Sequence, residues 1–311
     1  MRTKLLGILR IDALVPALLA GGLLAGCGGG AADGVPGDTG AQQAAEAAAG
    51  SLAQSPSRLS QAGGETERAA AANFEGTLQQ VIISLGPDAI RSVAGSNDLA
   101  TVLALSSDKV IDAVHGGAIQ ADSIHRSTLE IDGRMGRLQN EGEASYTVLD
   151  GRQVAAYVVD PENSMIMTMD PAKRAGAAAV RGEGSAPMDL DVEKVGEREI
   201  RGFHAIGHRF EFMDDNVATV WLSKDLERQV GPIFDIWQAI NPLGQMDVGD
   251  GAPVRVVMVN REALASGGGI MPAYTITEFY DLQPGAVAEG RFDLPDGYHQ
   301  VDMADLMRGA Q

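Results

Sequence analysis

Cysteine, aromatic residues and positive charge are all scarce in this chain of 311 residues. Its single cysteine, Cys27, excludes a framework of intramolecular disulfides. Only 24 lysines and arginines face 42 aspartates and glutamates, which gives a formal net charge of -18. Nucleic-acid binding and electrostatic docking on anionic lipid need a basic surface, so the composition argues against both. We attribute the acidity to solubility rather than to a cation site.

The sequence signatures of catalysis are also missing. The chain has no Gly-x-Ser-x-Gly turn, no glycine-rich phosphate loop ending in Lys-Ser or Lys-Thr, and no His-Glu-x-x-His pair. Acidic pairs are too frequent in so negative a chain to single out a site. We expect no catalytic residues and no enzyme activity. An active site assembled from distant residues leaves no such signature, so an enzyme stays a third hypothesis.

The apolar run near the N-terminus is too short to cross a membrane. It extends over Leu14–Leu24, about 11 residues, whereas the core of a bilayer needs roughly 20 helical residues. Arg2, Lys4 and Arg10 precede this run and small residues follow it, which is the order of an export signal. Residues 1–26 are therefore predicted to be a signal peptide.

The signal ends in Leu24-Ala25-Gly26-Cys27, which resembles the lipobox of bacterial lipoproteins. The resemblance implies cleavage between Gly26 and Cys27, with a diacylglyceryl group on the thiol and an acyl group on the new amine. We expect no other cofactor. Several acyl chains would hold the protein on a membrane durably. The alternative is an ordinary secretory signal, which would leave an unpaired thiol in an exported protein.

The residues after Cys27 predict a tether and a location. Gly28, rather than Asp, resembles the sorting pattern of outer-membrane lipoproteins, so we expect the periplasmic face of the outer membrane rather than the inner membrane. Residues 27–72 are rich in Gly, Ala and Gln and cannot bury enough surface to fold, which predicts a disordered stalk. Loss of three basic residues and one acidic residue with the signal changes the net charge from -18 to -20.

Residues 73–303 have the composition of one folded domain, and residues 304–311 follow it as a tail. Branched residues separated by Gly, Pro and Asp-Gly turns predict roughly ten strands with a few helices, a mainly β fold of the α+β class. Short helices are expected over 88–116, with Asn97 and Ser107 as N-caps, and an amphipathic helix over 225–241. Residues 170–188 lack periodicity and predict a long mobile loop. The strands are expected over 74–83, 126–131, 134–138, 144–149, 153–160, 165–169, 190–195, 204–213, 217–223, 254–260, 274–282 and 292–301.

Three blocks of this domain together resemble a known group. They are Phe74-Glu75-Gly76, the segment from Glu197 to Leu226 that contains Arg201-Gly202-Phe203-His204 and Trp221-Leu222-Ser223-Lys224, and Phe292-Asp293-Leu294-Pro295-Asp296-Gly297-Tyr298. In this order they are similar to an uncharacterised family of envelope lipoproteins with a LolA/LolB/RseB-like half-barrel. That resemblance implies a curved antiparallel sheet around a helical plug. It also implies an apolar concavity for a lipid, an acyl chain or a lipidated partner.

Met165, Met167 and Met169 alternate, so a strand places all three on one face. Soft thioethers could bind Cu(I), but an adaptable apolar wall explains them better. We expect no metal site, because His204 and His208 would lie about 13 Å apart on one strand. The Asp247–Gly251 loop also lacks the ligand spacing of an EF-hand. The candidate residues of a ligand cavity are Met165, Met167, Met169, Trp221, Phe234 and Trp237.

Two functional hypotheses follow from these features. The first is a non-enzymatic, membrane-anchored envelope lipoprotein that binds an apolar ligand, a lipid or a lipoprotein acyl chain, in its half-barrel. The second is a structural or sensory envelope protein that binds a protein partner through a sheet edge or a helix stripe, without a small-molecule ligand.

Overall fold

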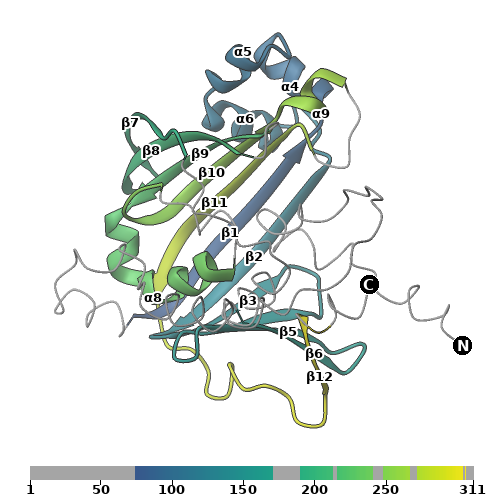
Figure 1. Cartoon of the computed structure of the whole chain (residues 1–311), viewed down its shortest axis with the longest axis vertical. Helices are drawn as coiled ribbons and strands as arrows, with labels where there is room; N and C mark the ends of the chain where they lie inside the picture. The colour runs from purple at the N-terminus through teal and green to yellow at the C-terminus, as the bar shows by residue number, and fades with distance from the viewer. Residues whose placement is uncertain are drawn as a thin grey trace, which may run out of the picture.

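One curved sheet dominates the computed structural model, which describes residues 74–170, 190–212, 216–240, 248–266, 272–303 and 305. Within these ranges the chain forms twelve strands in a single sheet that curves without closing (Figure 1). The mainly β fold class predicted from the sequence is confirmed. The predictions for the signal peptide, the stalk, the loop over 170–188 and the tail fall almost entirely outside the described residues.

The strands follow the order β12-β6-β5-β4-β3-β2-β1-β11-β10-β9-β8-β7 across the sheet. Every neighbouring pair is antiparallel except β12 and β6, which are parallel. The bounds are β1 Glu75–Leu85, β2 Ser123–Asp132, β3 Met135–Asn140, β4 Tyr146–Asp150, β5 Ala155–Asp160, β6 Met165–Met169, β7 Glu193–Ile200, β8 Phe203–Phe212, β9 Asn216–Ser223, β10 Ala252–Asn260, β11 Tyr274–Pro284 and β12 His299–Asp302.

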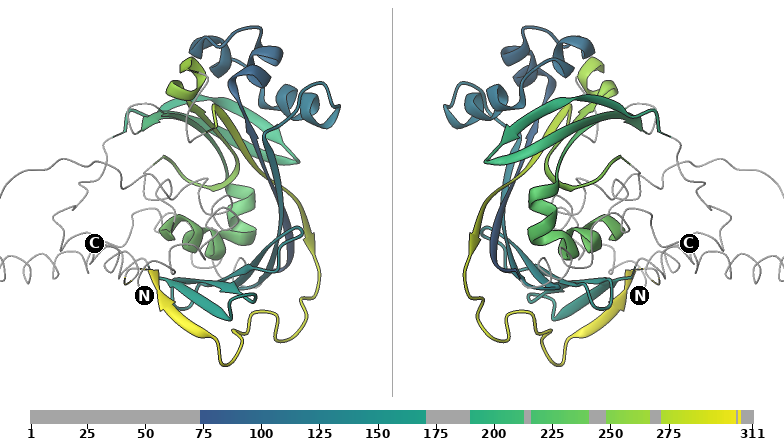
Figure 2. Two further views of the ribbon diagram at one scale, coloured as in Figure 1. Left: turned by 90° about the vertical axis from the view of Figure 1, so that its right-hand side faces the viewer. Right: turned by 90° about the vertical axis from the view of Figure 1, so that its left-hand side faces the viewer.

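The first strand, β1, lies in the middle of the sheet and is buried on both faces. Leu78 packs with helix α8 (Lys224–Ile240), which lies inside the curve of the sheet (Figure 2). Val81, Ile83 and Leu85 alternate to the other face and pack beneath the helices outside the curve. We call the face that contacts α8 the concave face and the opposite one the convex face.

Short helices cover one end of the convex face. They are α4 Pro87–Ala94, α5 Leu99–Leu103, α6 Ser107–His115 and α9 Arg261–Ser266, and their buried residues form one cluster with β1, β10 and β11. Two predicted N-caps are each displaced by one residue. Asp98, not Asn97, caps α5 by accepting a hydrogen bond from the Thr101 amide, and Ser106, not Ser107, precedes α6.

The last strand reaches the far edge of the sheet by a long detour. After β11 the chain runs along the outside of the sheet before β12 pairs with β6 (Figure 2). Arg291 binds Glu130 at 2.8 Å, and the Val287 amide donates to Glu75 at 2.6 Å. The prediction of a strand over 292–301 is wrong for its first part, because Pro295 offers no amide proton and Gly297 has φ of 78°.

Both Asp-Gly pairs lie at hairpins, as predicted, but the turns differ from the expected form. Gly133 and Arg134 form a two-residue connection with positive φ only at Gly133. At the second hairpin the Asp150 carboxylate accepts hydrogen bonds from the amides of Arg152 and Gln153. This stabilises a longer turn, in which Val154 has φ of 51°.

Val154 should be a position where substitution stabilises the fold. A branched side chain in the left-handed region costs about 1–2 kcal/mol, whereas glycine loses about 0.5–1 kcal/mol in chain entropy. The Val154 side chain is 47% exposed, so little burial is lost. We expect Val154→Gly to raise the free energy of unfolding by about 0.5–1 kcal/mol in urea titrations. Val154→Ala, which keeps a β-carbon, should gain less, and a loss of stability for the glycine variant would contradict the prediction.

Candidate functional site

The three methionines of β6 share the concave face, as their alternation predicted. Their partners on β5 are Asp160 for Met165, Val158 for Met167 and Ala156 for Met169. Met169 packs against the cluster formed with α8. Met167 is buried, and Met165 and Met169 are half-buried. That the three methionines line a ligand site stays a prediction.

The register continues from Met167 as a single, largely apolar row across the concave face. Successive partners follow from β6 to β1, one on each strand. At about 4.8 Å per strand, five steps cover about 24 Å. We call this set the Met167–Leu78 row, and it comprises Met167, Val158, Thr147, Leu138, Leu129 and Leu78.

Helix α8 lies over this face and contributes its own apolar side. Leu226, Val230 and Ile233 are buried in the cluster that also holds Leu78. Phe234 is buried too, and its ring meets Phe279 of β11 edge to face at 5.1 Å between centroids. Phe234 is therefore a core residue of the concave face, and its part in a ligand cavity stays a prediction, while the Trp237 side chain falls outside the described residues. No helix among the described residues is long and apolar enough to span a membrane.

Trp221 does not share the concave face with the methionines. Its partner on β10 is Arg255, and its ring lies beneath the Arg198 guanidinium at 3.9 Å, on the convex face. A β-carbon at Gly207 would come within 2.8 Å of this ring, so glycine is needed there. The assignment of Trp221 to the concave wall is therefore not supported by its position, because the residues of β9 alternate and Val220 and Leu222 occupy the inner side.

The sequence reading missed a buried ion network beside Trp221. Arg255 and Glu278 are each 1% exposed and are paired through two guanidinium nitrogens. Glu278 also accepts from Arg201 at 2.7 Å. Arg255 donates to Ser107 and contacts Asp108, both at 2.7 Å, so the network attaches α6 to the sheet. The only sign of this network in the sequence was a charged residue inside each of two apolar strands, Arg255 in β10 and Glu278 in β11.

Positive charge is divided unequally between the two faces. Every arginine of the described strands lies on the convex face, where the register places it opposite residues such as Val81 and Glu130. The one lysine in these strands, Lys194, pairs with His208 on the concave side, but at the edge strand β7. The middle of the concave face therefore presents apolar and neutral polar side chains. The arginines are Arg126, Arg137, Arg198, Arg209 and Arg255.

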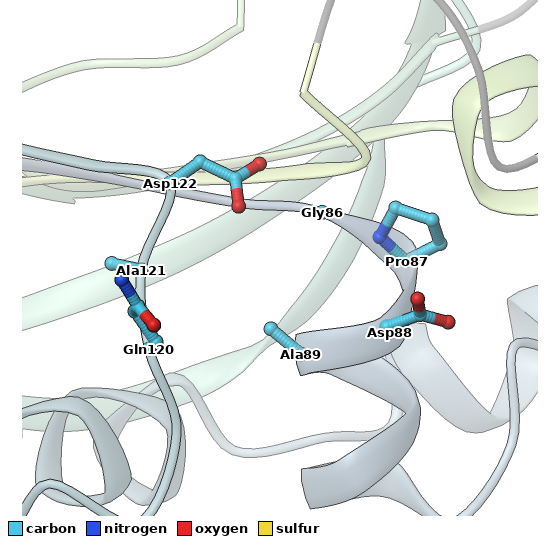
Figure 3. Close-up of a pocket in the computed structure, with 7 residues that line it drawn as sticks. All are labelled: Gly86, Pro87, Asp88, Ala89, Gln120, Ala121 and Asp122. Carbon is cyan, nitrogen blue, oxygen red and sulfur yellow. The ribbon is translucent and has the colours of Figure 1, made fainter.

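Two other features of the described residues carry no site. No group of three or more His, Cys, Asp or Glu side chains in the described ranges could hold a metal ion. A cavity of about 460 Å³ lies at the start of α4, with Asp88 and Asp122 on its walls (Figure 3). It is polar and separate from the methionines. The expectation that the protein needs no metal remains a prediction.

His208 is the titratable group of the concave face with a shifted pKa. Burial is the main cause and the charge of Lys194 adds to it, so the pKa lies below the usual 6.5. Gly249 lies against the ring, since a β-carbon there would come within 3.1 Å of Cε1. Protonation therefore favours the unfolded chain, and stability present above pH 6.5 is lost as the pH falls through that value toward the folded pKa.

We expect this group to make the free energy of unfolding pH-dependent. On going from about pH 7.5 to about pH 5.5 the wild-type chain should lose more stability than His208→Gln, which has no proton to gain. His299→Gln is the matched control, because His299 is exposed on β12. Parallel urea titrations measure the difference. Equal pH dependence in wild type and His208→Gln would refute the assignment.

Comparison with known proteins returns structural matches only. No family model and no curated protein matches the chain. An uncharacterized conserved protein from Thermus thermophilus aligns over 76% of this chain and 98% of its own, at 8% identity and TM-score 0.35. A chain of the Pseudomonas aeruginosa MucA/MucB complex aligns over 76% of this chain and 62% of its own, at 12% identity and TM-score 0.33. A LolA superfamily protein from Nitrosomonas europaea aligns over 74% of this chain and 97% of its own, at 10% identity and TM-score 0.29.

This chain spans 62% of the MucA/MucB chain that it matches. The fold itself is defined by the strand order, the open curvature and the helix on the concave face. By that geometry the described part of the chain is a LolA/RseB-like half-barrel.

Proposed function

We propose that this protein is a binding protein of the cell envelope that holds an apolar ligand, a lipid or an acyl chain, against the concave face of its half-barrel. One observation supports the proposal most directly. The Met167–Leu78 row is a continuous, largely apolar path of about 24 Å, on the scale of an extended acyl chain. Leu78 and Leu129 are buried in the cluster that holds α8, so a ligand at that end of the row would replace contacts of the helix. A catalytic role has no comparable support among the described residues.

The composition of the row suits a ligand without a fixed shape. Methionine is unbranched and polarizable, so it adapts to a flexible chain better than branched residues do. Met165 and Met169 flank Met167 on the same face and are half-buried. A ligand would lie beside α8 and share its apolar contacts, because Met169 already packs against the α8 cluster.

Attachment to the membrane is proposed to occur through Cys27. The support is the sequence Leu24-Ala25-Gly26-Cys27 after a short apolar run, together with the absence of any other cysteine. Acyl chains on Cys27 would give the location, and Gly28 favours the outer membrane over the inner. Because an acidic surface is not attracted to anionic lipid, the lipid anchor rather than surface charge would make the contact with the membrane.

A protein partner is the second candidate, and the edge strand β7 favours it. Its outer edge has no strand partner among the described residues, and an extended segment could pair with it. The α8 stripe is less suited to a partner, because its apolar residues are already buried in the chain's own core. Charged residues along β7 limit nonspecific pairing at this edge.

Substitution within the row tests the ligand proposal. We expect Met167→Gln to weaken binding of the neutral fluorophore N-phenyl-1-naphthylamine at least about tenfold, because a buried apolar side chain contributes about 1.5–3 kcal/mol. The full chain carrying Cys27→Ser, which has no acylation site, serves as the parent. Thr168→Gln is the control, since Thr168 is the next residue and alternates to the convex face. Circular dichroism verifies folding, and equal weakening by both variants would contradict the proposal.

Mass spectrometry tests the anchor. We expect the chain isolated from bacterial membranes to start at Cys27 and to carry diacylglyceryl and N-acyl groups. Globomycin, which inhibits the lipoprotein signal peptidase, should leave the signal peptide attached. Cys27→Ser should move the protein from the membrane fraction to the soluble fraction, whereas Gly30→Ser should not. An unmodified Cys27 in the mature chain would remove the basis for anchoring.

A further inference from the structure

Gln80 is a neutral polar side chain buried at the centre of the concave face. It is 3% exposed and lies in β1, the middle strand. The register pairs it with Ser127 of β2 and Phe279 of β11, and it shares its face with Leu78 two residues before it. The polar group therefore lies directly beside the end of the Met167–Leu78 row.

The side-chain amide oxygen of Gln80 has no hydrogen-bond partner among the described residues. Its Oε1 atom is buried, and no described group donates a hydrogen bond to it. Its neighbour Gln79, on the convex face, accepts a hydrogen bond from the Thr128 hydroxyl at 2.9 Å. Ser127, on the concave face beside Gln80, donates to Asn140 at 2.8 Å. Because buried polar groups are nearly always paired in folded proteins, an unpaired amide at this place points to a partner that binds there.

The charges around Gln80 restrict what that partner can be. The arginines of the strands lie on the convex face, and Lys194 lies at the far edge strand β7. The two cations of α8, Lys224 and Arg228, are exposed and paired with Asp250 and Asp225. A carboxylate brought to Gln80 would be buried without a cation, which is strongly unfavourable. A hydroxyl or an amide carries no charge, and it can donate a hydrogen bond to Oε1 and accept one in return.

We propose that Gln80 selects ligands whose acyl chain ends in a neutral, hydrogen-bonding group, such as a glyceryl hydroxyl or an amide, over free fatty acids. The acyl chain lies along the Met167–Leu78 row, and the neutral group reaches Gln80. At 3.3 Å per residue, Gln80 is about 7 Å from Leu78 along β1, a distance that a glyceryl group spans. The inference rests on the proposed function and adds the chemical class of the ligand.

Competition binding tests this selection on the full chain carrying Cys27→Ser. Bound N-phenyl-1-naphthylamine is displaced at about pH 7.5 with monomyristoyl glycerol or with myristate, two competitors with the same acyl chain. We expect the monoglyceride to compete at least about tenfold better than myristate. Gln80→Leu should weaken binding of the monoglyceride about five- to tenfold, the effect of one lost hydrogen bond, and bring its affinity close to that of myristate. Each competitor affinity is corrected for the variant's own affinity for the fluorophore.

Two controls separate selection from folding. Gln79→Leu makes the same change on the convex face of the same strand and should leave the ratio of the two competitors unchanged. Gln80→Leu should also raise the urea midpoint of the unliganded chain, because it removes an unpaired buried amide, so its loss of monoglyceride binding cannot come from unfolding.

The outcomes distinguish the inference from the function on which it rests. A wild-type ratio near one, or a ratio that Gln80→Leu does not change, overturns the role of Gln80 while the fluorophore still reports an apolar site. Failure of the wild-type chain to bind the fluorophore overturns both. A tenfold preference that disappears in Gln80→Leu and persists in Gln79→Leu supports the selection.

Discussion

The packing of α8 against the concave face is the interaction on which the rest of the architecture depends. An open sheet of this curvature has an inner surface that must be covered, and α8 supplies a buried stripe that reaches from Leu226 to Ile236. The contact between Phe234 and Phe279 fixes the helix against β11, near the middle of the sheet. Met169 of β6 packs against the same cluster, and Met165 and Met167 lie on the same face as Met169. The cover and the candidate ligand site are therefore parts of one surface.

The two faces of the sheet use different chemistry to hold their helices. On the concave side the buried residues of α8 pack in an apolar cluster, with one hydrogen bond from the Leu226 amide to Ser223 of β9 at the start of the helix. On the convex side α6 is held both by an apolar cluster and by the buried pair Arg255 and Glu278, which reaches Ser107 and Asp108. Buried ion pairs add little net stability but penalise wrong partners strongly. We infer that the convex face fixes one arrangement, while the concave face tolerates exchange of one apolar partner for another.

The sequence predicted those features that depend on local periodicity. The hairpins of the first half, α8 and the common face of Met165, Met167 and Met169 all follow from spacing of two or 3.6 residues. What it could not predict depends on strand order.

Trp221 appears as apolar as the methionines in the sequence, and only the pairing of β9 with β10 shows that it lies on the other face. The adjacent residues Gln79 and Gln80 cannot be told apart in the sequence. Gln79 accepts a hydrogen bond from Thr128, whereas the side-chain oxygen of Gln80 is buried without a donor. Arg255 and Glu278 could not be matched for the same reason. The pairing of distant strands is set by the tertiary fold and not by local pattern.

The central position of β1 has a consequence for how the chain folds. The strand synthesised first pairs with β2 on one side and with β11, near the end of the domain, on the other. The half that contains β2 to β6 can pair early, because its contacts are local. The half that contains β7 to β11 can join it only after almost the whole domain has emerged. Such non-local pairing is entropically slow, so β1 should present an open edge for longer than any other strand of the central sheet.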